Sequence, residues 1–532
     1  MNGSYSVWMN QWIPVVSGEG SSQYSLLDVY RDAHLIRRID AGDTLINAAL
    51  FRLLLAILID IYRPIHEDEW RRQWEQGCFD MEAVGRYAEQ VGNRFDLFDS
   101  VTPFYQTGHL ETPSGKVGST LLLLPESASG NNVPLFSTRT EASSPRLCLG
   151  EAARRLVTLQ AIDVAGIKAG AIGDPQMRSG KTTGNPVGAL GKIGITIPMG
   201  RNLFESLMLN VPLGLDEEDD SPTWHQPPSK PNWETRPSRG ILDLLTWQSR
   251  RVRLIPDDEE DPKAVIGVIV AAGDRLEWVD PAHEPHTAWM KVEGNKEVVP
   301  QRPIRHQAGK SAWRGMDSLL AFKEDSSRTA ANSLFWVGSR EDVIGQSYPL
   351  EVDIAGVIYG NQSAVIEDVI SDSTPMSVVA LSSTPEGQNL RDDLMGVAGM
   401  AEEIRRALNQ LLDNLRSSYG GTPIPWNKGE HPGDQFIAAI DPVTRRFLKE
   451  VRDDPSSLNN GLIAWEGAAW MVAWSIADPL IVQVPPSAFI GRKSGSENKQ
   501  PPINQARAEA YFRNKLRNVL MRMNKPAKEG EN

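Results

Sequence analysis

The spacing of apolar residues predicts helices and strands alternating through the first two thirds of the chain. Between Asp43 and Tyr62, apolar residues cover a broad face, which predicts a buried helix. Further helices are expected from Ser25, a plausible cap, over Glu67 to Gln90 and over Glu151 to Ala165. Runs rich in β-branched residues and bounded by turns predict strands at Trp12 to Val15, Val265 to Ala272, Ser333 to Gly338 and Leu350 to Ile358.

The apolar period changes near Ser382. One stripe then recurs every three or four residues, at Leu390, Leu394, Val397, Ala401, Ile404, Leu408, Leu411 and Leu415. Three more amphipathic segments follow, over Phe436 to Val451, Leu462 to Ile476 and Ala506 to Met523. The pattern predicts an α+β protein, with a mixed α/β N-terminal domain over residues 1–380 and a four-helix bundle over 381–532.

Two stretches lack periodic apolar residues and bracket the helix Glu151 to Ala165. Pro125 to Pro145 is rich in turn residues and predicts a long loop. Gly170 to Gly194 is rich in glycine and predicts a second loop. Its Gly180-Lys181-Thr182 resembles the end of a P-loop, but Pro175 stands where the motif needs its first glycine. The segment is therefore expected to be a mobile loop or a loop that touches nucleic acid.

Composition limits the class of protein. A chain of 532 residues is long enough for two to four domains. Its net charge of −13 argues against a protein that wraps DNA, although Arg492 to Lys525 holds 9 basic and 2 acidic residues. Cys78 and Cys148 are far apart, which argues against a disulfide framework and a cysteine zinc site. The sequence has no signal peptide and no apolar run of membrane-spanning length, so we expect a cytoplasmic protein without a membrane partner.

Candidate chemistry for an enzyme is weak. Proline in His283-Glu284-Pro285-His286 prevents the helical spacing of a zinc protease motif. The acidic clusters at 216–220 and 257–261 lack the ligand spacing of an EF-hand and predict solvated loops. We find no ordered triad and no pair of carboxylates that suggests catalysis, and we expect no cofactor, no metal and no catalytic residue.

A series of short motifs resembles one family. In chain order they are WIPV, SLLDVY, LFRLLLAIL, PFYQ, GRNLFESLMLNV (200–211), SPTW (221–224), TWQ (246–248) and YGNQS (359–363). With the terminal helices, they resemble the large subunit of type I-E CRISPR Cascade, the CasA family. The resemblance implies a non-enzymatic subunit of an RNA-guided complex that reads the protospacer-adjacent motif (PAM) on target double-stranded DNA and helps start unwinding. It also implies three further partners: the CRISPR RNA 5′ handle, the other Cascade subunits and a helicase-nuclease.

The resemblance also implies DNA-contacting residues. Asn361, Gln362 and Ser363 match a glutamine wedge that enters the base step beyond the PAM. The glycine-rich stretch matches a loop that reads the minor groove, with Gly170 and Gly173 as first candidates and Gly180 as the next. A lysine finger falls at Lys291, with Lys296 as the alternative. Minor-groove reading is degenerate, so tolerance of several PAMs is expected.

Two other groups of residues complete the expected contacts. Phe136, Ser137 and Thr138 fall where the family meets the guide's 5′ handle, and Phe136 could stack on a base or anchor its loop. Arg513 and Arg517 lie on the outer side of the last helix, which is either a solvated basic face or a surface that guides a DNA strand. Some members of the family have a CxxC zinc site, and this sequence has no counterpart of that site.

Two alternatives stay open at this point. A nucleotide-dependent hydrolase would use Gly180-Lys181-Thr182, and ATP turnover lost on Lys181→Ala would reveal it. A purely structural scaffold would use its terminal helices only to pack against neighbouring subunits.

Overall fold

The protein divides into two compact units. The computed structural model describes residues 4–124, 144–215, 217–292, 301–322, 327–425, 428–492 and 502–522. Unit 1 comprises Met1–Lys310, Ala321–Val343 and Leu350–Ser373. Unit 2 comprises Ser311–Leu320, Ile344–Pro349 and Thr374–Asn532, so two short segments between parts of unit 1 belong to unit 2.

Unit 1 contains small, mostly antiparallel sheets. The first two have strand orders β2–β1–β3 and β4–β10–β5–β6, with β9 also paired to β10, and the others are β11–β8, β13–β12–β14 and β16–β15–β7. Their bounds are β1 Ile13–Ser17, β2 Gly20–Tyr24, β3 Ile36–Ile39, β4 Leu147–Cys148, β5 Gly166–Ala169, β6 Lys181–Asn185, β7 Ile195–Met199, β8 Thr235–Arg236, β9 Arg250–Pro256, β10 Ala264–Ala272, β11 Arg275–Leu276, β12 Trp289–Lys291, β13 Gln301–Pro303, β14 Arg328–Thr329, β15 Glu351–Tyr359 and β16 Ile366–Pro375. The strands predicted near Trp12, Val265 and Leu350 are confirmed as β1, β10 and β15.

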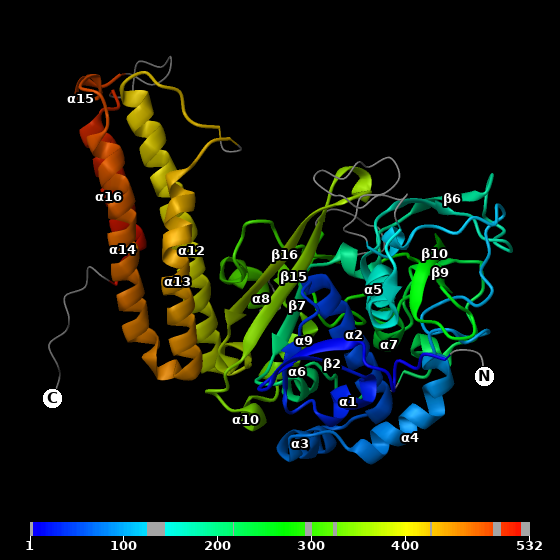
Figure 1. Cartoon of the computed structure of the whole chain (residues 1–532). Helices are drawn as coiled ribbons and strands as arrows, with labels where there is room; N and C mark the ends of the chain where they lie inside the picture. Colours follow the sequence, from blue (N-terminus) through cyan, green and yellow to red (C-terminus); the bar gives the residue numbers. More distant parts are fainter. Residues whose placement is uncertain are drawn as a thin grey trace. The chain divides into compact units, whose positions relative to one another are not determined.

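Helices cover these sheets, as Figure 1 shows. The α-helices of unit 1 are α1 Leu26–Arg31, α2 Thr44–Tyr62, α3 Glu67–Gln76, α4 Met81–Val91, α5 Leu149–Ile162, α6 Leu203–Leu209, α7 Ile241–Leu245, α9 Asn332–Gly338 and, at its edge, α10 Glu341–Ile344. Short 3-10 helices are η1 Gly92–Phe95, η2 Thr120–Leu123, η3 Ala189–Lys192, η4 Thr223–His225 and η6 Asn361–Ser363. Ser25 caps α1 as predicted, through a capping box with Asp28.

Helix α2 is the centre of unit 1. Asp43 caps it by accepting hydrogen bonds from the backbone N–H groups of Leu45 (2.8 Å) and Ile46 (3.3 Å). The helix is long and apolar enough to cross a membrane by length and composition, but 78% of its apolar window is buried inside the protein. It packs against α5, α6, α7 and β15. We therefore interpret α2 as a core helix, which fits its predicted burial.

Two predicted elements are wrong. The single helix expected over Glu67 to Gln90 is broken into α3 and α4, because Gly77 adopts a left-handed conformation (φ 73°) that ends α3. The strand expected over Ser333 to Gly338 is helix α9, which buries Ser333, Leu334 and Val337 on one side. That spacing suits a helix, and the short apolar run did not distinguish the two structures.

Unit 2 is built from long helices. They are α12 Pro385–Ser418, α13 Pro432–Asp453, α14 Leu458–Val482 and α16 Gln505–Val519, with the short α8 Met316–Leu319, α11 Val378–Leu381, α15 Ser487–Ile490, η5 Ala312–Gly315 and η7 Pro455–Ser457. Helix α12 packs against α13, α14 and α16, and α13 packs against α14 (Figure 1). Every residue of the predicted α12 stripe is buried. The segment 311–320 joins this unit through Trp313, whose indole N–H donates to Asp441 Oδ1 (2.7 Å).

Candidate nucleic-acid interface

The predicted glutamine turn lies at the tip of the β15–β16 hairpin (Figure 1). Gln362 (φ 54°) and Ser363 (φ 56°) both adopt the left-handed conformation, which is uncommon for residues with a side chain. Asn361 and Gln362 are exposed. Among the described residues, the side-chain amide of Gln362 has no hydrogen-bond partner. The turn therefore presents a polar group that the rest of unit 1 does not use.

The glutamine turn is fixed to the connection between α5 and β5. The Ala165 N–H donates to the Ser363 carbonyl oxygen (2.9 Å), and the Tyr359 hydroxyl donates to the Ile162 carbonyl oxygen (2.8 Å). Gly191 lies against the Tyr359 hydroxyl so closely that an added Cβ would collide with it. The left-handed residues are thus held by neighbouring structure, without which a strained turn does not persist.

The glycine-rich stretch is more ordered than predicted. Instead of one loop over Gly170 to Gly194, it contains strand β6, which pairs with β5, and the 3-10 helix η3. Gly170 is buried, its N–H donates to the Gly180 carbonyl oxygen (2.9 Å), and Met177 fills the space of a missing side chain. Gly173 (φ 91°) and Gly180 (φ 74°) are exposed. Of the three candidates, these two present backbone to solvent.

The resemblance to a P-loop does not extend to the geometry. A P-loop needs a strand, a loop and then a helix that starts at the lysine and threonine. Here Lys181 and Thr182 lie inside strand β6. Thr182 is buried and its hydroxyl donates to Asp174 Oδ2 (3.0 Å), so it is not available for a metal-bound nucleotide. The Gly180-Lys181-Thr182 sequence therefore forms part of the β5–β6 hairpin.

Asp174 ties the glycine-rich stretch to the body of unit 1. Its carboxylate is 7% exposed. Besides Thr182, it accepts hydrogen bonds from the Trp233 indole N–H (3.2 Å) and from the Gln176 backbone N–H (2.9 Å). The Arg275 guanidinium lies over the Trp233 ring, 3.8 Å from its centroid. Sequence reasoning missed Asp174 because its partner Trp233 is remote in the chain.

A buried ion cluster supports the same region from the other side. The Asp163 carboxylate follows α5 and pairs with Lys168 (2.6 Å) and Arg250 (2.5 Å). Burial alone would raise the pKa of Asp163, but the two cations outweigh it and lower the pKa. The Asp163 carbonyl oxygen accepts the Gly188 N–H (3.0 Å). The α5–β5 connection therefore anchors both the glutamine turn and the glycine-rich stretch.

Lys291 is the exposed last residue of strand β12. This strand lies between β13 and β14, and its Trp289 is buried. The sheet is bonded to the end of the glycine-rich stretch, since the Gly194 N–H donates to the Ile304 carbonyl oxygen (3.0 Å) and its own carbonyl oxygen accepts the Thr287 hydroxyl (2.9 Å). The lysine, glycine and glutamine elements thus belong to one hydrogen-bonded framework in unit 1.

Some predicted residues cannot be assessed in this framework. Phe136, Ser137, Thr138 and Lys296 lie outside the described residues.

On the basic side of the last helix, α16, Arg513 makes contacts within unit 2. Arg513 pairs with Glu509 (2.6 Å) and lies over the Trp474 ring, 4.8 Å from its centroid. Arg517 is exposed. These contacts give Arg513 a structural use, which the sequence pattern left open.

The histidine motif is structural, whereas residues 217–219 and 258–261 of the acidic clusters are exposed as predicted. Glu284 and Arg52 form a buried ion pair (2.6 Å), and His286 Nε2 lies 2.9 Å from Asn210 Oδ1. Burial and the nearby Arg52 lower the pKa of His286, so the ring is neutral. No cluster of three metal-ligating side chains occurs among the described residues. Asp220 was predicted to be solvated, but it is 1% exposed and accepts the backbone N–H groups of Leu242 and Asp243 (both 2.9 Å).

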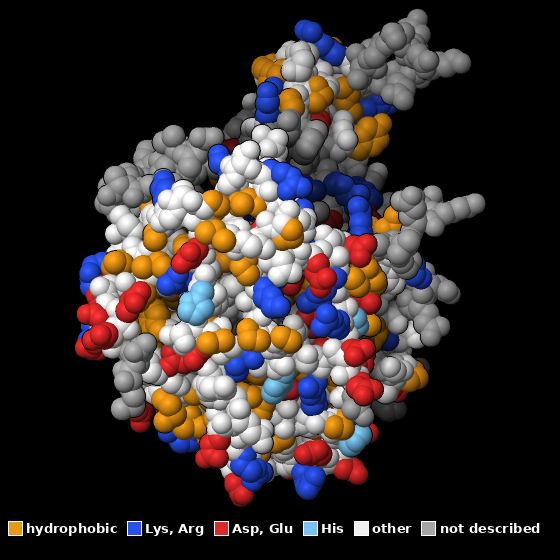
Figure 2. All heavy atoms as spheres, turned by 90° about the vertical axis from the view of Figure 1, so that its right-hand side faces the viewer, with side chains coloured by type: hydrophobic (Ala, Val, Ile, Leu, Met, Phe, Trp, Pro, Cys, Tyr) orange, Lys and Arg blue, Asp and Glu red, His pale blue; other side chains and the backbone are white. Residues whose placement is uncertain are grey.

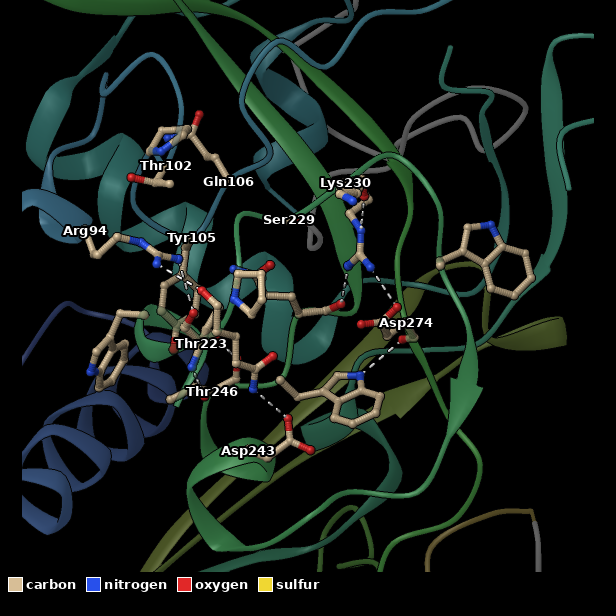
Figure 3. A pocket seen from close by; sticks show the side chains of 18 of the residues that line it. Arg94, Thr102, Tyr105, Gln106, Thr223, Ser229, Lys230, Asp243, Thr246 and Asp274 are labelled. Atoms are coloured by element: carbon tan, nitrogen blue, oxygen red, sulfur yellow. Dashed lines mark hydrogen bonds and ion pairs between the residues drawn. The ribbon is translucent and has the colours of Figure 1, made fainter. Parts of the chain in front are cut away.

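A polar cavity of about 270 Å³ borders this framework (Figure 3). Its arginines are already bonded: Arg94 donates to the carbonyl oxygens of Gln226 and Thr223, and Arg251 pairs with Asp274 (2.7 Å). Trp233 lines the cavity and also bonds Asp174. The cavity wall therefore supports the glycine-rich stretch.

Charge is mixed on the protein surface. The face in Figure 2 carries interspersed acidic and basic side chains rather than a field of one sign. This agrees with the net charge of −13, and any contact with DNA phosphates must be local.

Comparison with known proteins identifies the family. The model for CRISPR-associated protein Cse1 matches residues 9–476. The CasA/Cse1 protein of Thermus thermophilus is 27% identical over 420 residues, which cover 77% of each chain. The crystal structure of Thermobifida fusca Cse1 matches with a TM-score of 0.84 and 29% identity, over 98% of this chain and 99% of that one. A chain of a CRISPR RNA-guided surveillance complex shares the fold, with a TM-score of 0.69 and 20% identity over 90% of this chain and 99% of that one. The chain therefore belongs to the CRISPR-associated protein Cse1 family, the large subunits of type I-E Cascade.

Proposed function

We propose that this subunit recognises the PAM on target duplex DNA and starts its unwinding with Gln362. The observation that carries the proposal is the exposed Gln362 amide, held in a left-handed conformation at a hairpin tip and left without a partner among the described residues. Such a conformation costs about 1–2 kcal/mol and persists only where the surroundings hold it. An amide inserted into a base step replaces hydrogen bonds of the pair that it opens, which offsets part of the unstacking cost.

The neighbouring elements would read the groove beside that step. Exposed backbone at Gly173 and Gly180 allows close approach to DNA, and the buried Gly170 holds Gly180 through its N–H. Asn361 and Ser363 shape the wedge, and Lys291 enters the minor groove as the lysine finger. Because the minor groove carries a degenerate code, several related PAMs are accepted.

The remaining assignments complete this role. The subunit binds the CRISPR RNA 5′ handle through Phe136, Ser137 and Thr138, assembles with the other Cascade subunits and recruits the helicase-nuclease in the cytoplasm. It has no catalytic activity of its own. Its C-terminal helices form a four-helix bundle, in which Arg513 and Arg517 guide a DNA strand.

The test is unwinding by the complex assembled with guide RNA and a Gln362→Ala subunit. A fluorescent base analogue in the first pair beyond the PAM reports opening. Loss of the amide hydrogen bond costs about 1 kcal/mol, so the opening equilibrium falls roughly fivefold. Gln23→Ala is the matched control, since Gln23 is an exposed strand residue of unit 1. Opening equal to that of the Gln23 variant would refute the wedge.

One observation favours a purely structural role for the basic helix. Arg513 is already bonded to Glu509 and stacked on Trp474. Charge reversal at Arg513 and Arg517 decides between the roles. Reduced DNA affinity in an intact complex supports strand guiding, whereas intact affinity with impaired assembly supports a scaffold.

A further inference from the structure

Two basic side chains, Lys192 and Arg305, lie near each other at the end of the glycine-rich stretch. Lys192 ends η3, and its Nζ donates to the Leu276 carbonyl oxygen (2.7 Å). Arg305 is exposed, and its Nε donates to the Lys192 carbonyl oxygen (3.2 Å). Among the described residues, neither side chain has a carboxylate within ion-pair distance, and the two Nη groups of Arg305 have no acceptor. The pair therefore carries two positive charges without a counter-charge.

Lys192 and Arg305 differ from the ion-paired arginines of unit 1. Several exposed arginines of unit 1 pair with carboxylates, as Arg31 does with Asp28 (2.7 Å) and Arg86 with Glu82 (2.5 Å). Burial and the adjacent Arg305 lower the pKa of Lys192 to about 8, so the protein holds this ammonium group at a cost. An anion bound beside Lys192 and Arg305 would reduce that cost.

The position of the pair connects it with the proposed wedge. Gly191, next to Lys192, lies against the Tyr359 hydroxyl. Burial raises the pKa of Tyr359, and the Arg305 guanidinium is close enough to act in the opposite direction. Tyr359 ends β15, directly before the turn that carries Gln362. The Lys192 backbone and the Arg305 guanidinium therefore lie where the glycine-rich stretch meets the base of the glutamine turn, and the Lys192 ammonium lies at the Leu276 carbonyl oxygen.

We propose that Lys192 and Arg305 form a phosphate site, which binds a backbone phosphodiester of the target DNA beside the base step that Gln362 enters. The inference rests on the proposed function and adds an anchor to it. The Nη groups of Arg305 suit paired hydrogen bonds to phosphate oxygens, and Lys192 adds a point charge. A phosphate fixed here would set the register of the duplex without reading its sequence.

The test uses the full complex assembled with guide RNA and carrying Arg305→Gln or Lys192→Met. Affinity for a PAM-containing duplex is measured between 50 and 200 mM KCl. Each variant should reduce the slope of log affinity against log salt by about 0.9, because one phosphate contact is lost. Discrimination between duplexes with and without a PAM should stay unchanged. Arg86→Gln is the matched control, since it removes one exposed, ion-paired arginine of unit 1 with the same change in net charge.

A second measurement identifies the phosphate. Neutral methylphosphonate replaces single phosphates next to the PAM, one position at a time. At one position the substitution should weaken binding by the wild type and not by Arg305→Gln, while Arg305→Lys, which retains the charge, should keep most of the wild-type slope. Slopes equal to that of Arg86→Gln, or no such position, would overturn the phosphate site. A wild-type complex that ignores the PAM would instead refute the proposed function.

Discussion

Removal of the Asp174 carboxylate should loosen the glycine-rich stretch without unfolding unit 1. The carboxylate is the only acceptor that the structure gives, within the described residues, to both the Thr182 hydroxyl and the Trp233 indole N–H. Thr182 belongs to β6, and Trp233 belongs to the cavity wall. Asp174→Ala therefore cuts the side-chain link between the hairpin and its support.

The magnitude follows from these two bonds. A hydrogen bond to a charged group contributes about 1.5–3 kcal/mol, so two contribute roughly 3–6 kcal/mol. The buried carboxylate paid a desolvation cost that alanine does not, which leaves a net loss of about 3 kcal/mol. Local opening of β6 should then be about 100-fold more frequent. Asp174→Asn keeps one acceptor oxygen, and we expect about half of that loss in free energy.

Amide hydrogen exchange of the full chain measures this opening. Peptides that cover 170–185 should exchange about 100-fold faster in Asp174→Ala, whereas peptides from α2 should keep their protection. Asp258→Asn is the control, since Asp258 lies in an exposed surface turn. Protection of β6 within a fewfold of the wild type would refute the link, and faster exchange in α2 as well would show that Asp174 supports all of unit 1.

Two further predictions concern charge. If phosphate binding restores the pKa of Lys192 from about 8 to its ordinary 10.5, DNA affinity is greatest below pH 8 and falls about tenfold between pH 7 and pH 9, because Lys192 loses its proton at a lower pH in the free protein than in the complex. Measuring DNA affinity as a function of pH checks this, and Lys192→Arg should abolish the fall. Arg52→Met leaves Glu284 as a buried unpaired charge and should destabilise unit 1 by about 3–5 kcal/mol. Calorimetry should show a lower melting temperature for unit 1 and an unchanged melting temperature for unit 2. The double variant Arg52→Met with Glu284→Leu should recover much of the lost stability.

Long periodic segments were predictable from the sequence. The stripe from Leu390 to Leu415 extends over many turns, so each buried residue repeats the same evidence for a helix. The run Ser333 to Gly338 is too short for that, and its burial depends on neighbours that the sequence does not identify. Gly77 ends α3 because it adopts the left-handed conformation of a helix C-cap. The pattern of charged residues over Glu67 to Gln90 does not reveal this conformation.

The candidate site was predictable only in part. The order of short motifs indicated the glutamine turn, and β15 was predicted from its apolar pattern. The supports of the turn were not predictable, since they are backbone groups of Ile162 and Ala165 that carry no sequence signal. The same holds for Arg305, because only the folded chain determines that no described carboxylate pairs with it.

These supports bear on how the proposed groove-reading and wedge elements would act together. The glutamine turn bonds to Ala165, and the glycine-rich stretch bonds to Asp163 through Gly188. Both elements therefore rest on the same few residues after α5, and Asp163 holds those residues through a buried pair of cations. A displacement of the glycine-rich stretch by a bound duplex would act on the base of the turn through the Gly188–Asp163 hydrogen bond, the backbone from Asp163 to Ala165 and the Ala165–Ser363 hydrogen bond. If the proposed function holds, PAM reading and wedge insertion are coupled mechanically at this connection, and substitutions that loosen it should impair unwinding more than initial binding.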